Sequence, residues 1–311
     1  MKDNSERLRS FTLDSLPDLD IVTLAALELF EDEQLPEVDF RQFKRPLVVG
    51  SGNAAVTGKL LFDDVDAVFA DESSYLEKLV AVHSIDGAFL LSASGGKHAI
   101  EIAKTLTERS LPVVLLTNNA NAPAGEYIQP GAVHVFPKNR EPYTYNTSTY
   151  MGMILSKTHE DPQTIFQFIQ SSLQQVIPTN LAKYDAFYFL VPTEFNDVRE
   201  LFKTKFDELF GPRLMARIFT VEQTKHAKTV IPGDNELFVS FGEENFFFGK
   251  PENRLFVPLP PDADYASMMA VGYYFIGLIQ KQFPPYYKER IVAYAQETSE
   301  AFGSVISPIV E

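Results

Sequence analysis

Residues 88–97 read AFLLSASGGK, an apolar run followed by a loop of serines and glycines. The run predicts a buried strand, and apolar side chains then recur at helical spacing at Ala99, Ile102, Ala103 and Leu106. Such a loop presents hydroxyls and backbone N–H groups at the start of a helix, where anions bind. We therefore predict a phosphate site at Ser92, Ser94, Gly95 and Lys97, although a plain turn capped by Ser94 also fits the loop alone.

Apolar strands alternate with amphipathic helices on both sides of this stretch. Strands are predicted near 47–49, 67–70, 113–116 and 133–136, and in the second half near 187–191, 217–219, 236–240 and 255–257. Strands that are apolar throughout are typical of parallel sheets covered on both faces. We predict an α/β protein with two flavodoxin-like three-layer α/β/α domains. The expected parts are an N-terminal helical extension (1–44), a first domain (45–156), a linker helix (157–180) and a second domain with a C-terminal helix (181–311).

Composition narrows the possible partners. The net charge of −15 argues against a broad nucleic-acid surface, which needs clustered Lys and Arg. The chain has no cysteine, so thiolate catalysis and disulfides are excluded. Its first residues lack the apolar core of a signal peptide, and the longest uncharged stretch, 265–280, is too short and mixed for a membrane span. We expect a cytoplasmic protein with no nucleic-acid and no membrane partner.

A second glycine-containing loop, Gly50-Ser51-Gly52-Asn53, follows the first predicted strand. In open parallel sheets, ligands bind beyond the carboxyl ends of the strands, so this loop is expected near the same ligand. With Ala55 it also satisfies the G-x-G-x-x-A dinucleotide pattern, and Glu72 falls about where a ribose ligand would lie. A dinucleotide enzyme is an alternative that we rank last, because it leaves the serine loop unexplained.

The charged candidates of the second half lie on a helix predicted over 195–210. We expect most of them to form a solvated face with local ion pairs: Glu200, Lys203, Lys205, Asp207 and Glu208. Glu208 and the later His226 are of the types that move protons near neutral pH, although a lone histidine is more often structural. His83, His134 and His159 show no metal-ligand spacing, so we expect no metal site.

At these positions the sequence resembles the sugar isomerase (SIS) domain family. The serine loop is similar to the family's S-x-S-G-x-T phosphate loop, with Lys97 in place of the threonine. Residues 71–75, DESSY, resemble its S-E-F-x-Y element, and residues 141–149 resemble its E-x-x-V-A-S-T segment. Residues 199–208 and His226 resemble the catalytic helix and histidine of double-SIS enzymes. These include the isomerase half of glucosamine-6-phosphate synthase and bifunctional phosphoglucose/phosphomannose isomerases. Residues 240–244, SFGEE, depart from a second phosphate loop.

The resemblance implies a function and roles for the residues. It implies an aldose–ketose isomerase of a hexose 6-phosphate that works as a homodimer without a cofactor. Glu208 would move the proton between C1 and C2, and His226 of a neighbouring subunit would open the sugar ring. The implied phosphate ligands are Gly50, Ser51, Gly52, Ser92, Ser94, Gly95 and Lys97, and further substrate contacts are expected from Asn53, Glu72, Glu141 and Thr147. The alternatives are an amino-sugar phosphate deaminase, a fructosamine phosphate deglycase and a sugar-phosphate sensor without turnover.

Overall fold

The computed structural model describes residues 3–311, which form two compact units. Unit 1 comprises residues up to Glu31, Asn139–Ser148 and Glu160–Glu311. Unit 2 comprises Asp32–Lys138 and Thr149–His159. The division therefore does not follow the order of the chain, because the first residues are grouped with the second half.

Unit 2 is built on a five-stranded parallel sheet with the order β2-β1-β3-β4-β5. This is the flavodoxin-like order, in which β2 is added on one side of β1 and β3, β4 and β5 on the other, so that the switch point of the strand order lies between β1 and β3. Its strands are β1 (Pro46–Gly50), β2 (Val68–Ala70), β3 (Gly87–Leu91), β4 (Val113–Thr117) and β5 (Val133–Val135). Its helices are α3 (Asn53–Leu61), α4 (Tyr75–Ala81) and α5 (His98–Glu108), together with most of α6 (Thr147–Thr158).

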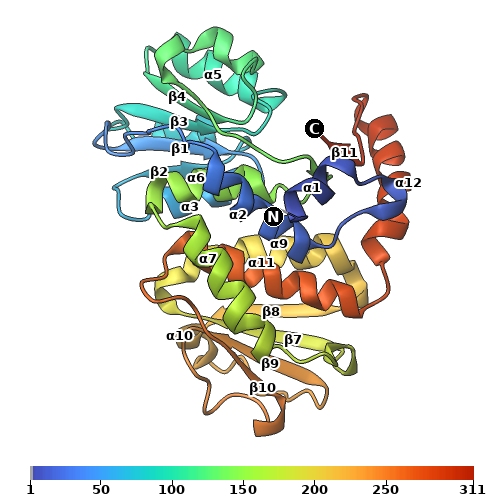
Figure 1. Cartoon of the computed structure of the whole chain (residues 1–311). Helices are drawn as coiled ribbons and strands as arrows, with labels where there is room; N and C mark the ends of the chain where they lie inside the picture. Colours follow the sequence, from blue (N-terminus) through green and yellow to red (C-terminus); the bar gives the residue numbers. More distant parts are fainter. Residues whose placement is uncertain (1–2) are drawn as a thin grey trace. The chain divides into compact units, whose positions relative to one another are not determined.

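Alternating residues of this sheet pack in opposite directions. Leu47, Leu90 and Leu115 belong to a buried cluster with α4 and α5. On the other face Phe89 packs against Phe62, which follows α3, so that helices cover both faces of the sheet (Figure 1). The strands are apolar on both faces for this reason, as the sequence predicts.

Unit 1 contains a four-stranded parallel sheet with the order β10-β9-β7-β8. The switch point of this strand order lies between β7 and β9, as it lies between β1 and β3 in the first sheet. The strands are β7 (Ala186–Val191), β8 (Met215–Thr220), β9 (Glu236–Phe241) and β10 (Arg254–Val257). The helices of unit 1 include α1 (Asp3–Ser10), α2 (Leu19–Asp32), α7 (Pro162–Phe168), α8 (Gln174–Val176), α9 (Arg199–Phe210), α10 (Val221–Thr224), α11 (Tyr265–Gln282) and α12 (Tyr286–Phe302).

Phenylalanine side chains form much of the core between this sheet and its helices. Phe189 of β7 packs edge-on against Phe206 of α9 and Phe275 of α11. On the opposite face Tyr188 and Leu190 form a small cluster with Phe248, a loop residue. One face is thus covered by long helices, and the other by the short α10 and a loop.

The α/β class and the predicted parallel sheets are confirmed. Residues 33–44 differ from the helix predicted there, since they are not helical and contain Pro36. The predicted linker over 157–180 contains a π-helical stretch, Ile169–Leu173, between α7 and α8. A short antiparallel ladder joins β6 (Glu141–Pro142) to β11 (Ile309–Val310), and the sequence does not predict it. Among the described helices, none is long and apolar enough to cross a membrane.

Candidate functional site

The serine loop lies at the switch point between β1 and β3 of the first sheet. Gly50 ends β1 and Ser92 follows β3, and these two strands are neighbours. The residues after them line a cavity of about 130 Å³, with Ser51 from one loop and Ser92, Ser94 and Lys97 from the other. The structure therefore brings together the two loops that the sequence assigns to one ligand.

Hydrogen bonds from the segment after β4 hold the serine loop in place. The carbonyl oxygen of Ala93 accepts from the Asn118 amide at 2.9 Å and from the Thr117 hydroxyl at 3.0 Å. The Asn119 side chain donates to the carbonyl of Ser94 at 3.0 Å. The backbone amide of Ala124 donates to the carbonyl of Gly95 at 2.8 Å. Three successive carbonyl groups are thus occupied by protein donors, and the amides of Gly95 and Gly96 donate to the Ser92 and Ser94 hydroxyls at 3.2 Å each, so the loop has a defined conformation.

Two positions of the loop have left-handed backbone conformations. Gly95 has φ +63°, and a Cβ built there would lie 2.4 Å from the Cβ of Ala122. Only glycine fits this contact. Lys97 has φ 49° and ψ −124°, close to the φ 54° and ψ −125° of Gly52 in the corresponding turn before α3. A lysine with positive φ is strained, and such strain is concentrated at functional sites.

Other predicted ligands of unit 2 lie near the ends of β1 and β2. Ser51 and Gly52 are exposed, and Asn53 begins α3. Glu72 follows β2, and its buried Oε2 has no hydrogen-bond partner within residues 3–311. A buried carboxylate oxygen without a donor is an available acceptor for a ligand hydroxyl.

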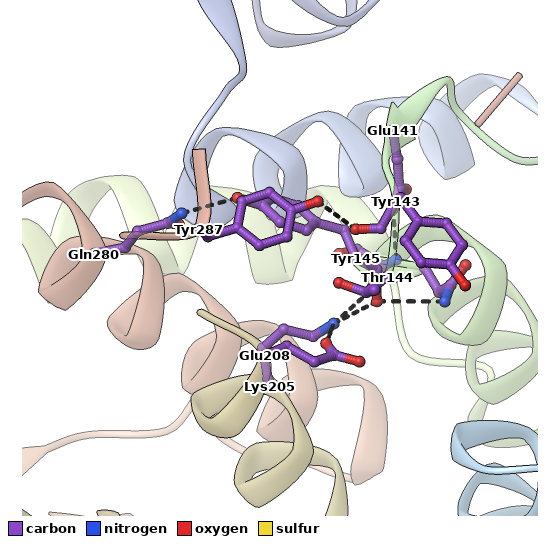
Figure 2. A network of polar contacts seen from close by, with 10 residues as sticks. Glu141, Tyr143, Thr144, Tyr145, Lys205, Glu208, Gln280 and Tyr287 are labelled. Atoms are coloured by element: carbon purple, nitrogen blue, oxygen red, sulfur yellow. Dashed lines mark hydrogen bonds and ion pairs between the residues drawn. The ribbon is translucent and has the colours of Figure 1, made fainter. Parts of the chain in front are cut away.

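The charged helix α9 differs from the prediction at one decisive residue. Lys205 is not on a solvated face, since its side chain is completely buried. Its ammonium contacts Glu208 at 2.7 Å and donates to the carbonyls of Thr144 at 2.8 Å and Tyr145 at 2.9 Å (Figure 2). It also lies 5.5 Å from the centre of the Tyr273 ring. Lys205 therefore fixes the Glu208 carboxylate to a defined backbone segment.

That backbone segment is itself unusual. Thr144 and Asn146 have φ values of 75° and 47°, and they flank the carbonyl groups that Lys205 binds. Glu141 is buried and accepts hydrogen bonds from the amides of Thr147 at 2.6 Å and Ser148 at 2.7 Å. Burial raises the pKa of Glu141, while these donors and the Ser148 hydroxyl act in the opposite direction. Its contacts are those of a cap for α6, and the buried Thr147 hydroxyl has no partner within the described residues.

Glu208 also borders a cavity. Its side chain is 22% exposed and lines a space of about 590 Å³ together with Thr144, Arg213 and Tyr287. Burial raises the pKa of Tyr287, and its hydroxyl donates to the carbonyl of Tyr143. A carboxylate that is both oriented by an ammonium and open to a cavity can exchange a proton with a bound molecule.

His226 lies away from Glu208 within the chain. It is exposed in the turn after α10, and it does not line the cavity at Glu208. Glu208 lies near the end of α9, which leads to the start of β8, whereas His226 follows the end of β8. The six residues of β8 extend over roughly 20 Å. The structure therefore does not bring the two proton-transfer candidates together within one chain.

Lys205 is the residue that sequence reasoning misjudged. A signal was present, because Leu201, Phe202, Phe206 and Leu209 form the apolar stripe of α9 and Lys205 lies within it. A charge on such a stripe is expected to be buried with a partner. No pattern in the sequence predicts the hydrogen bonds from Asn118 and Asn119 to the serine loop, because these bonds join segments that follow two different strands.

The fold, with two doubly wound parallel sheets, is shared with several solved structures. Glucosamine-6-phosphate deaminase from Thermotoga maritima has a TM-score of 0.58 at 13% identity, covering 86% of this chain and 96% of that one. The C-terminal domain of glucosamine-fructose-6-phosphate aminotransferase from Francisella tularensis has a TM-score of 0.61 at 13% identity, with 88% and 97% covered.

Tagatose-6-phosphate ketose/aldose isomerase from Escherichia coli has a TM-score of 0.56 at 13% identity, with 92% and 94% covered. No family model matches the sequence, and no curated protein matches it significantly. These likenesses show a shared fold at low sequence identity.

Proposed function

We propose that this chain binds a phosphorylated sugar in the serine loop and isomerises a hexose 6-phosphate between its aldose and ketose forms. The observation that carries the proposal is the loop itself, with two hydroxyls, a lysine and a helix start at the switch point of the first sheet. Its cavity of about 130 Å³ is below the roughly 300–1,000 Å³ of whole small-molecule pockets, so we propose that it holds only the phosphate group of the ligand.

The proposed chemistry divides binding from proton transfer. Ser51, Ser92, Ser94 and Lys97 hold the phosphate, and this remote binding energy positions the reacting carbons. Glu208 removes the proton from one carbon and returns it to the neighbouring carbon through an enediolate, so the reaction needs no added oxidant or reductant. His226 moves protons at the sugar oxygens. Because Glu208 and His226 lie at opposite ends of β8, we propose that His226 acts across a homodimer.

Two other functions remain candidates. The solved structures with this fold include a glucosamine-6-phosphate deaminase, which favours nitrogen-containing sugar phosphates as a second substrate class. A cytoplasmic sensor that binds a sugar phosphate without turnover would use the same loop and leave Glu208 without a chemical role.

Turnover of fructose 6-phosphate, followed by NMR in deuterated water, separates these functions. An isomerase will exchange the C1 or C2 proton with solvent in wild type, and Glu208→Gln will lose at least about 100-fold of this rate. Glu200→Gln, on the same helix, serves as the matched control. Release of ammonia from glucosamine 6-phosphate would favour the deaminase. Binding with no exchange and no ammonia would favour the sensor.

A further inference from the structure

The second sheet has a cavity of its own at its switch point. The residues that end β7 and β9, including Leu190 and Ser240, line a space of about 430 Å³. These strands correspond in order to β1 and β3, whose ends form the serine-loop site. Because ligands of open parallel sheets bind at the reversal point, the position itself indicates a second binding site.

The chemistry of this second cavity is opposite to that of the serine loop. β3 is followed by α5, which supplies a helix start, whereas β9 is followed by residues 242–250 and then by the short turn Pro251–Asn253. The loop carries Glu243 and Glu244, and both line the cavity. The site thus lacks the helix that favours an anion and presents two carboxylates instead.

The carboxylates are not used by the fold. Neither Glu243 nor Glu244 pairs with a cationic side chain within residues 3–311. Lys225 also lines the cavity, but its ammonium is paired with Glu222 at 2.5 Å. Exposed carboxylates in a cavity without a local counter-ion favour a positively charged ligand.

A buried hydroxyl points to the same ligand chemistry. Ser240 is 2% exposed and lines the cavity. In the described part of the chain its hydroxyl makes no hydrogen bond. The hydroxyl oxygen is open to the cavity and is available to accept from an N–H group there.

The wall of the cavity is aromatic and is held rigidly. Phe246 and Phe247 are 76% and 80% exposed, which is unusual for phenylalanine. Their loop is fixed by Arg254, which donates to the carbonyls of Phe246 at 2.6 Å and Phe247 at 2.9 Å. The Asn245 carboxamide oxygen accepts from the amide of Phe248 at 2.8 Å. Exposed aromatic rings on a braced loop can contact the apolar part of a ligand, and the face of a ring can also contact an ammonium group.

We propose that this cavity binds an organic cation, with an ammonium group at Glu243, Glu244 and Ser240 and an apolar body against Phe246 and Phe247. A volume of about 430 Å³ is within the range for a small-molecule ligand. The site is separate from the serine loop, and it does not depend on the proposed isomerase activity.

Ligand-observed NMR titration of the full chain with tyramine tests the proposal. Tyrosol and phloretic acid are the matched neutral and anionic probes. Tyramine will bind at least about tenfold more tightly than tyrosol, because charge-assisted hydrogen bonds and a cation–π contact require the ammonium. The double variant Glu243→Gln/Glu244→Gln will lose about tenfold in tyramine affinity, and Ser240→Ala will lose several-fold. Fructose 6-phosphate will not displace tyramine.

The control variant is Glu252→Gln, an exposed glutamate in the same connection that does not line the cavity. It will bind tyramine as wild type does. Equal affinities for tyramine and tyrosol, or unchanged binding in the double variant, would overturn the proposal. A change of oligomeric state in Phe246→Ser/Phe247→Ser, with no tyramine binding in wild type, would instead identify this surface as a contact between copies.

Discussion

Lys205 is the residue on which the geometry of Glu208 depends. A buried ammonium is tolerated when its partners compensate for lost hydration, and here two carbonyl groups and a carboxylate do so. Each of these partners loses its donor if the ammonium is removed. The expected consequence is loss of stability as well as loss of Glu208 orientation.

Replacing Lys205 with methionine keeps the volume and removes the charge. We expect Lys205→Met to lower the free energy of unfolding by about 3–5 kcal/mol, as for a broken buried ion pair. Lys203→Met on the exposed face of the same helix will stay within about 0.5 kcal/mol of wild type. Urea denaturation followed by circular dichroism measures both. Equal effects of the two substitutions would contradict the structural role of Lys205.

Lys97 combines a positive charge with a strained backbone, and two substitutions separate these features. Lys97→Gly and Lys97→Ala both remove the charge and should weaken phosphate binding alike. Lys97→Gly will be the more stable of the two by about 1 kcal/mol, because only glycine adopts a φ of 49° without strain. Thermal unfolding and phosphate titration of the two variants provide the measurement. If alanine were the more stable, the strain at position 97 would be disproved.

At the scale of elements, the edge strand β5 carries a partly buried histidine, His134. Burial lowers the pKa of His134 below its usual value of 6.5. Between the folded-state and unfolded-state pKa values, His134 is therefore more often protonated in the unfolded chain than in the folded chain. This contribution to stability is complete above about pH 6.5 and is lost as the pH falls through the lower, folded-state pKa.

His134→Gln removes this dependence. Between pH 7.5 and pH 5, about the range where histidine titrates, wild type will lose more thermal stability than the variant does. His83→Gln, an exposed histidine, will retain the wild-type slope. Differential scanning calorimetry at several pH values measures the slopes, and parallel curves for wild type and His134→Gln would refute the assignment.

Elements with a strong local pattern were predictable, and contacts between distant segments were not. The strands of both sheets follow from apolar runs, and the serine loop follows from its position between β3 and α5. The ladder between β6 and β11 joins residues more than 160 positions apart and has only two residue pairs, so no periodicity reveals it. The aromatic loop after β9 likewise depends on Arg254, whose role is visible only in three dimensions.

At the scale of the whole molecule, the separation of Glu208 from His226 has a testable consequence. If His226 acts in the site of a partner subunit, each site combines Glu208 of one subunit with His226 of the other. Glu208→Gln and His226→Ala then remove different members of this pair. In a mixed dimer one site then contains both intact residues. Co-refolded equal mixtures of the two variants should recover up to about a quarter of wild-type turnover, since half of the dimers are mixed and each has one intact site.

Light scattering will give a mass about twice the 35.0 kDa of one chain. A monomer, or mixtures without any recovery of turnover, would show that His226 does not act across a dimer. Those results would leave phosphate binding by the serine loop unaffected.

The central claim is that the serine loop binds the phosphate of a sugar phosphate. Isothermal titration calorimetry of fructose 6-phosphate against unphosphorylated fructose tests it most directly, with wild type, Ser92→Ala/Ser94→Ala and the control Ser171→Ala, an exposed serine of unit 1. We predict binding that requires the phosphate, falls at least about tenfold in the double variant and is unchanged in Ser171→Ala. Equal binding of the two sugars, or full binding in the double variant, would contradict the claim.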